Sequence, residues 1–161
     1  MFMSDKIGVL NNGCIEQFGS PIDLYLRPKS TFIAEFFGDI NTLEGVVKDG
    51  SVSTVLGTFN CSQKFNNKNV TIVIREEAIK LFSATKINLN KKDETNFIKS
   101  SYYGYVMEAR LLAGSSLVHL SLKVDEKKIH FHARIPGLNF FKVDEKVIVE
   151  TDPKQIFIFE Q

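Results

Sequence analysis

The feature that most constrains the fold is a series of short runs of β-branched and aromatic residues that fills the chain after residue 40. Residues 51–56, 70–75, 97–112 and 147–151 are examples, and Gly104 predicts a bend or bulge in the third. The polar stretches 62–69 and 83–96 are predicted loops, and residues 125–127 are a predicted turn. Turn signals such as Asp49-Gly50 separate the runs, because Asp and Gly tolerate the backbone angles of tight turns. Eight or nine short strands at this regular spacing predict a mainly β fold, built as one or two small OB-like barrels.

The first 40 residues have a different character, which predicts a β-hairpin followed by helices. Asn12-Gly13 lies between two strand-like runs, and both residues tolerate the positive φ of a two-residue turn. Ser20 can cap a helix whose first residue is Pro21, since proline has no amide hydrogen to leave unpaired there.

A second helix is predicted to begin after Ser30 and to end at Gly38, where a left-handed residue commonly terminates a helix. Its large apolar residues share one stripe at helical spacing. They are Phe32, Ile33, Phe36 and Phe37. Each such side chain contributes roughly 1.5–3 kcal/mol when it is buried. We therefore expect this stripe to be an interaction surface that docks on the barrel or on a second chain; the alternative is disorder of residues 1–30.

The composition excludes several classes of function. The chain of 161 residues has 20 basic and 19 acidic residues and a net charge of +1, which argues against a protein that binds nucleic acid through a basic surface. Its two cysteines, Cys14 and Cys61, make neither a disulfide framework nor a four-ligand zinc site. No apolar run approaches the roughly 20 residues that span a bilayer, so we expect a soluble, cytoplasmic chain.

The N-terminal segment carries the most specific signal. Residues 4–21 read S-D-K-I-G-V-L-N-N-G-C-I-E-Q-F-G-S-P, residues 22–28 read I-D-L-Y-L-R-P, and residues 32–41 read F-I-A-E-F-F-G-D-I-N. These stretches resemble, at matched spacing, the end of the ATPase domain of ABC transporters. Gly38-Asp39-Ile40-Asn41 resembles the spermidine/putrescine-importer subgroup more than the maltose or ferric-iron types.

The remainder of the chain resembles more loosely the C-terminal regulatory region of importer ATPases, an OB-like module called TOBE. The stretch V-I-R-E-E at residues 73–77 is similar to the family's V-x-x-R-P-E, with Glu76 in place of proline. The stretch V-I-V-E-T-D-P at residues 147–153 is similar to the closing V-x-V-x-W-x-P strand, with Thr151 in place of the aromatic residue.

The resemblance implies a domain division and a function. Residues 1–40 would be the C-terminal remnant of an ATPase domain. Residues 41–161 would be a TOBE-type regulatory domain, with a possible division into half-barrels at the polar tract 83–96. The chain would then be the regulatory and dimerisation part of the ATP-binding subunit of a polyamine importer. Its partners would be a second copy, through the β domain, and membrane subunits, through the parent ATPase domain. That complex would place it at the inner face of the plasma membrane.

The motifs of ATP hydrolysis do not occur in the sequence. There is no G-x-x-x-x-G-K-[ST] loop to hold phosphates and no L-S-G-G-Q signature, and the first histidine is His119. We therefore expect no enzymatic activity and no cofactor in this chain alone. ATP and Mg²⁺ would belong to the parent protein, of which this chain looks like the C-terminal part.

His130 and His132 are the weak candidates for metal ligands. At spacing i, i+2 on a strand they point to one face, and His119 could be a third ligand if its strand is adjacent. The alternative is an ordinary strand with a polar outer face, for which alternation alone accounts.

Arg75, Glu76 and Glu77 are candidates for a ligand-binding or regulatory cluster. A polyamine would need carboxylates and aromatic faces of the kind that Tyr102, Tyr103 and Tyr105 supply. The alternative is a solvated turn. Other hypotheses for the whole chain are a module that senses a solute or an oxyanion without an ATPase role, an importer subunit for iron(III) or sugar, and an OB-type module for oligonucleotides.

Overall fold

A computed structural model describes residues 5–84, 102–124 and 127–161. The strands are β1 (Ile7–Asn11), β2 (Cys14–Gly19), β3 (Ile40–Val46), β4 (Ser51–Thr54), β5 (Gly57–Asn60), β6 (Asn69–Arg75), β7 (Ile79–Ser83), β8 (Tyr102–Leu112), β9 (Ser115–Val124), β10 (Lys127–Pro136), β11 (Lys146–Thr151) and β12 (Ile156–Glu160). The helices are α1 (Pro21–Leu26) and α2 (Thr31–Phe36), with single 3₁₀ turns η1 (Gln63–Phe65), η2 (Glu76–Ala78) and η3 (Pro153–Gln155). The predicted fold class, mainly β after a hairpin and two short helices, is confirmed.

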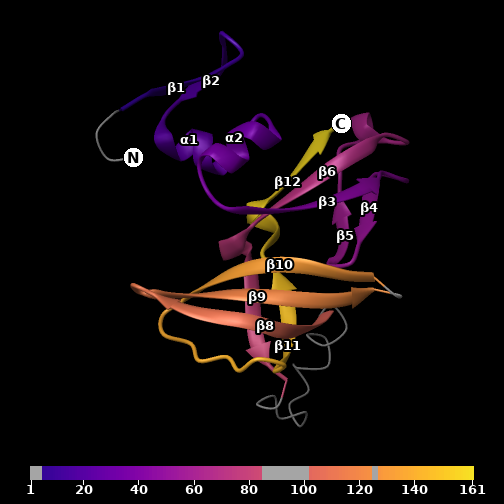
Figure 1. The fold of residues 1–161 in the computed structure, drawn as a ribbon. Helices are drawn as coiled ribbons and strands as arrows, with labels where there is room; N and C mark the ends of the chain where they lie inside the picture. Colours follow the sequence, from indigo (N-terminus) through magenta and orange to yellow (C-terminus); the bar gives the residue numbers. More distant parts are fainter. Residues whose placement is uncertain (1–4, 85–101, 125–126) are drawn as a thin grey trace.

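The strands form two larger sheets and two hairpins. The five-stranded sheet has the order β10-β9-β8-β11-β7, and the three-stranded sheet has the order β12-β6-β3. The hairpins are β1-β2 and β4-β5. Figure 1 shows β1-β2 and the two helices at one end of the molecule and the broad β8-β9-β10 layer toward the other end, with β3, β6 and β12 between them.

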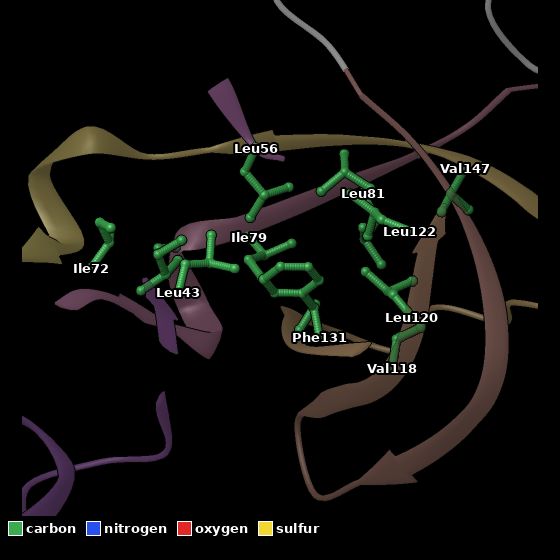
Figure 2. Close-up of a cluster of buried hydrophobic side chains, with 14 of the residues drawn as sticks. Leu43, Leu56, Ile72, Ile79, Leu81, Val118, Leu120, Leu122, Phe131 and Val147 are labelled. Atoms are coloured by element: carbon green, nitrogen blue, oxygen red, sulfur yellow. The ribbon is translucent and has the colours of Figure 1, made fainter. Parts of the chain in front are cut away.

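One hydrophobic core joins the two larger sheets. Leu43 and Ile72 come from the three-stranded sheet, and Leu120 and Val147 come from the five-stranded sheet. Figure 2 shows Phe131 between these two groups. A smaller cluster of Val9, Leu24 and Ile33 holds the N-terminal hairpin and helices together. No helix in the described residues is long and apolar enough to cross a membrane.

The local signals of the N-terminal segment are confirmed. Asn12 and Gly13 have φ angles of 50° and 80°, as the two-residue turn requires. The Ser20 hydroxyl accepts a hydrogen bond from the amide of Asp23 at 3.1 Å, which caps α1. The Ser30 hydroxyl accepts one from the amide of Ile33 at 3.3 Å, which caps α2.

Two predictions about glycines are wrong. Gly38 does not end α2 in a left-handed conformation: its φ is not positive, and the helix is capped by Phe37 with φ −101°. The irregularity in β8 lies between Val106 and Glu108 rather than at Gly104. A side chain at Gly104 would place its Cβ 3.2 Å from Val149 Cγ2, so close strand packing is the reason for that glycine.

Other predictions need correction or lie outside the described residues. The strand predicted at residues 51–56 ends at Thr54, and the loop predicted at 62–69 contains η1. The sequence patterns do not indicate β7. The polar tract predicted as a loop at 83–96 lies, beyond Ala84, outside the described residues, as does most of the turn predicted at 125–127.

Candidate functional site

Arg75, at the end of β6, lies where the N-terminal segment meets the β domain. Its Nη2 donates a hydrogen bond to the carbonyl of Tyr25 at 2.9 Å, and its Nη1 donates one to the carbonyl of Ala34 at 3.1 Å. These carbonyls belong to the C-terminal turns of α1 and α2, and neither helix has a basic residue in its own last turn. Carbonyls at helix C-termini lack partners within the helix and attract positive charge. One arginine from a strand therefore supplies the cation for both helices.

The Arg75 guanidinium is enclosed by aromatic rings. Its Cζ lies 4.0 Å from the centre of the Tyr25 ring and 5.6 Å from that of Phe157 in β12. The residue is fully buried, and its Nε has no hydrogen-bond partner among the described residues. Burial lowers the pKa of the Arg75 guanidinium, and burial raises the pKa of the Tyr25 phenol. An arginine still keeps its charge under such a shift, so the contacts with carbonyls and rings stabilise a buried cation.

Gly38 is required by the same contact. A Cβ at this position would lie 2.9 Å from Arg75 Nη1, closer than side-chain carbons normally approach other atoms. Gly38 belongs to the stretch of sequence that resembles a family motif. In the structure it leaves space for the guanidinium of Arg75, which lies 37 positions further along the chain.

A second layer of charged side chains covers this contact. Arg134 Nη2 in β10 lies 3.1 Å from Asp39 Oδ2 and 3.2 Å from Glu76 Oε2, and Arg134 Nε lies 3.6 Å from Glu77 Oε1. The Glu76 amide donates a hydrogen bond to the carbonyl of Asp39 at 3.4 Å. Burial raises the pKa of the Glu76 carboxyl, with a further contribution from Asp39, while Arg134 opposes the shift. We call Tyr25, Gly38, Asp39, Arg75, Glu76, Glu77 and Arg134 the Arg75 joint.

The structure places the predicted residues 75–77 together, at the contact between the N-terminal helices and β10. Arg75 is fully buried and the Glu76 side chain is only 6% exposed, whereas the Glu77 side chain is 41% exposed. The arrangement holds two parts of the chain together, and only Glu77 of the three is open to solvent. The sequence offered no signal for Asp39 and Arg134 as their partners, because those residues are far apart in the chain.

Asn41 in β3 is a further connecting residue that the sequence analysis missed. Its Oδ1 accepts a hydrogen bond from the His132 amide at 2.7 Å, and its Nδ2 donates one to the His132 carbonyl at 2.9 Å. The side-chain amide thus pairs with β10 as a neighbouring strand would. It links the three-stranded sheet to the edge of the five-stranded sheet, and the sequence separation of 91 residues hides the contact.

The histidines predicted as weak metal candidates lie close together on the surface. His119 in β9 is directly opposite His132 in β10, and their ring centres are 4.6 Å apart. His130 Nδ1 lies 3.2 Å from His119 Nε2. Burial, with His132 and His130 beside it, lowers the pKa of His119. No group of three or more His, Cys, Asp or Glu side chains in the described residues is already arranged around one metal position.

The predicted apolar stripe is divided between two environments. Ile33 is buried against Val9 and Leu24, and Phe37 packs partly on that cluster. Phe36 is 63% exposed, and its ring centre lies 6.2 Å from that of Phe32. Ile33 therefore stabilises the N-terminal segment, while Phe32 and Phe36 remain at the surface.

Comparison with known proteins supports the predicted resemblance. No protein-family model matches the chain. The chain is 36% identical over 104 residues to the spermidine/putrescine import ATP-binding protein PotA of Acetivibrio thermocellus, which covers 63% of this chain and 30% of that protein. The chain is related to polyamine-importer ATP-binding proteins. The resemblance predicted from the sequence is thereby confirmed.

Other relatives carry the same description. PotA of Aster yellows witches'-broom phytoplasma is 50% identical over 80 residues, covering 48% of this chain and 19% of that protein. PotA of Clostridium novyi is 32% identical over 145 residues, covering 88% of this chain and 40% of that protein. The chain thus spans less than half the length of these curated relatives.

Among solved structures, the cytoplasmic molybdate-binding protein ModG with molybdate bound matches with a TM-score of 0.49 and 14% identity, covering 73% of this chain and 94% of that chain.

Proposed function

We propose that this chain is the regulatory and dimerisation part of the ATP-binding subunit of an ABC importer for spermidine or putrescine. The observation that carries the proposal is the similarity to polyamine-importer ATP-binding proteins over as much as 88% of the chain. Residues 1–40 form the end of the ATPase domain, and residues 41–161 form the regulatory β domain. ATP and Mg²⁺ bind in the rest of the parent protein, and this chain alone does not hydrolyse ATP.

The Arg75 joint supports a mechanical role within such a subunit. Regulation by a C-terminal domain requires that the domain does not swivel freely relative to the ATPase domain. The buried Arg75 contacts the ends of both α1 and α2, and Arg134 adds ion pairs to Asp39 and Glu76. A movement or a contact of the β domain is therefore transmitted to the helices rather than lost in a flexible connection.

A standing contact between two β domains would act through effective concentration. Two ATPase domains that remain connected close on each other in an intramolecular step, which is favoured over a new encounter. The parent subunits would meet the membrane subunits through their ATPase domains, so the chain lies at the inner face of the plasma membrane without entering it.

A segment exchange tests the transport role. The segment of the Clostridium novyi relative that aligns with this chain is replaced by this chain, and uptake of labelled spermidine is measured in cells that lack their own polyamine importer. We expect uptake above that of a protein truncated before the segment. The same exchange protein with the substitution Arg75→Met should lose most of this uptake. With the substitution Arg110→Gln, at an exposed arginine, it should retain the uptake. Uptake no higher than that of the truncated protein, at equal protein level, would overturn the proposal.

Light scattering of the purified chain tests dimerisation. At low concentration we expect a mass of twice 18.2 kDa that persists in a Phe36→Ser variant, because the proposed dimer contact is made by the β domain. A monomer at every concentration would contradict the dimerisation role while leaving the transport role to the exchange experiment.

A further inference from the structure

All three histidines of the chain lie on one face of the five-stranded sheet. His119 in β9 is paired with His132 in β10, and His130 is two residues from His132, so the three side chains project from the same side. The opposite side of these strands carries the core residues Leu120 and Phe131. Figure 1 shows β9 and β10 side by side in the outer layer of the molecule.

Two imidazole nitrogens already have the separation of ligands that share one metal ion. His130 Nδ1 and His119 Nε2 are 3.2 Å apart. Two nitrogens bound to a tetrahedral zinc ion at about 2.0–2.1 Å lie roughly 3.3 Å from each other. An alternating polar strand accounts for polar residues on this face, but it does not account for two ring nitrogens that converge.

The third histidine is close enough to complete the set. The ring centre of His132 is 4.6 Å from that of His119, and its side chain is 52% exposed, so it can change rotamer without disturbing the core. A hollow of about 160 Å³ lies beside these residues, lined by Glu108, Arg110, Leu117, His119 and His132. The Glu108 carboxylate lies opposite His119 on β8 and is paired with Arg110 Nε at 2.7 Å, so this pair brings no net negative charge to the hollow.

We propose that His119 and His130 chelate a divalent transition-metal ion such as Zn²⁺ or Cu²⁺, and that His132 turns to become the third ligand. Imidazole nitrogen suits these ions, and water would fill the remaining positions. Both facing nitrogens must then be unprotonated, so the histidine that donates the present hydrogen bond moves its ring proton to its other nitrogen. Within the described chain only two nitrogens converge before the metal binds, in agreement with the absence of a preformed three-ligand group.

Cu²⁺ binding to the tag-free chain tests this site. The cysteines Cys14 and Cys61 are replaced by serine in every sample. Calorimetry should show one saturable site, and the electron paramagnetic resonance spectrum should show coupling to imidazole nitrogen. His119→Gln and His130→Gln should each weaken binding at least about tenfold, and His132→Gln should weaken it less. Zn²⁺ should displace the Cu²⁺ signal competitively.

Arg110→Gln is the matched control, because Arg110 lines the same hollow and is exposed but is not a ligand. The substitution frees the Glu108 carboxylate from its ion pair, so this variant should bind Cu²⁺ at least as tightly as the parent chain. His130 is exposed, so its glutamine variant should fold even if the His119 variant does not; circular dichroism checks both. A spectrum without nitrogen coupling, or equal affinity in the parent chain and His130→Gln, would overturn the proposal. Equal affinity in His132→Gln would overturn the role of the third ligand.

Discussion

Arg75 is the residue on which the connection between the N-terminal segment and the β domain depends most. Both of its hydrogen bonds go to carbonyls at helix ends. One of its aromatic neighbours, Tyr25, lies in α1, and the other, Phe157, lies in β12. An uncharged side chain of similar length could fill the space, but it would leave the two carbonyls without donors. Burial of an unsatisfied carbonyl is unfavourable by itself.

We expect Arg75→Met to lower the free energy of unfolding by about 3 kcal/mol, because two buried carbonyls lose their donors. Urea unfolding followed by circular dichroism measures the change. Arg110→Met serves as the control at an arginine exposed to solvent, where a change within about 0.5 kcal/mol is expected. Equal destabilisation by the two substitutions would show that Arg75 does not hold the joint.

Glu76 gives the second prediction, which concerns pH. The raised pKa of the Glu76 carboxyl means that the folded protein holds this proton more tightly than the unfolded chain does. As pH rises above the ordinary glutamic acid value of 4.5, the unfolded chain releases the proton first, so this group lowers stability until the folded-state pKa is passed. Glu76→Gln should remove that decline. Glu77→Gln, at an exposed neighbour, should leave it in place, and urea midpoints measured from pH 4 upward should separate the two. A decline that persists unchanged in Glu76→Gln would contradict this account.

At the scale of elements, the N-terminal hairpin and helices present an apolar surface that nothing in the described chain covers. Its exposed large side chains are Leu10, Ile15, Phe18, Ile22, Leu26 and Phe36, each between 51% and 69% exposed. A surface of this kind favours association with another protein surface. Under the proposed function, the rest of the ATPase domain would cover this surface.

We therefore expect dimers of the purified chain to associate further through this surface as the concentration rises. Phe18→Ser with Phe36→Ser should weaken that association, measured as light-scattering mass against concentration. The control is Leu138→Ser with Phe140→Ser, a pair of residues at least as exposed, on the loop after β10. If both double variants associate alike, the N-terminal surface is not responsible.

How much the sequence reveals differs between elements. Ser20, Ser30 and Asn12-Gly13 act on residues within a few positions of themselves, so the hairpin and both helices could be predicted. Strand β7 follows η2 directly and has no turn signal of its own, so it could not. The joint could not be predicted either, because the contact from Arg75 to Ala34 spans 41 residues and depends on how sheets pack. The site of His119 and His130 could be predicted in part. Alternation along a strand predicts which face each side chain points to, but the distance between the two rings depends on how β9 pairs with β10.

At the scale of the whole molecule, β12 closes the structure. It pairs with β6, which in turn pairs with β3, and it brings Phe157 against Arg75. Truncation after Gln155 would leave one edge of β6 unpaired and would remove Phe157 from the guanidinium. We expect the melting temperature to fall on the order of 10 °C or more, measured by circular dichroism. Glu160→Gln, which removes only the surface pair with Lys68, should change it little. A truncated chain that melts with the parent would contradict the closing role of β12.

The position of β12 has a consequence for how the protein is made. When β6 leaves the ribosome its partner β3 has already been synthesised, but β12 begins only at residue 156. At a synthesis rate of roughly 5–20 residues per second, one edge of β6 stays unpaired for about 4–16 seconds before β12 is made. An open edge of Val and Ile residues is a template for pairing with other nascent chains. We therefore expect a period in which the nascent chain depends on chaperones until β12 is made, and slow codons between residues 75 and 156 would lengthen it.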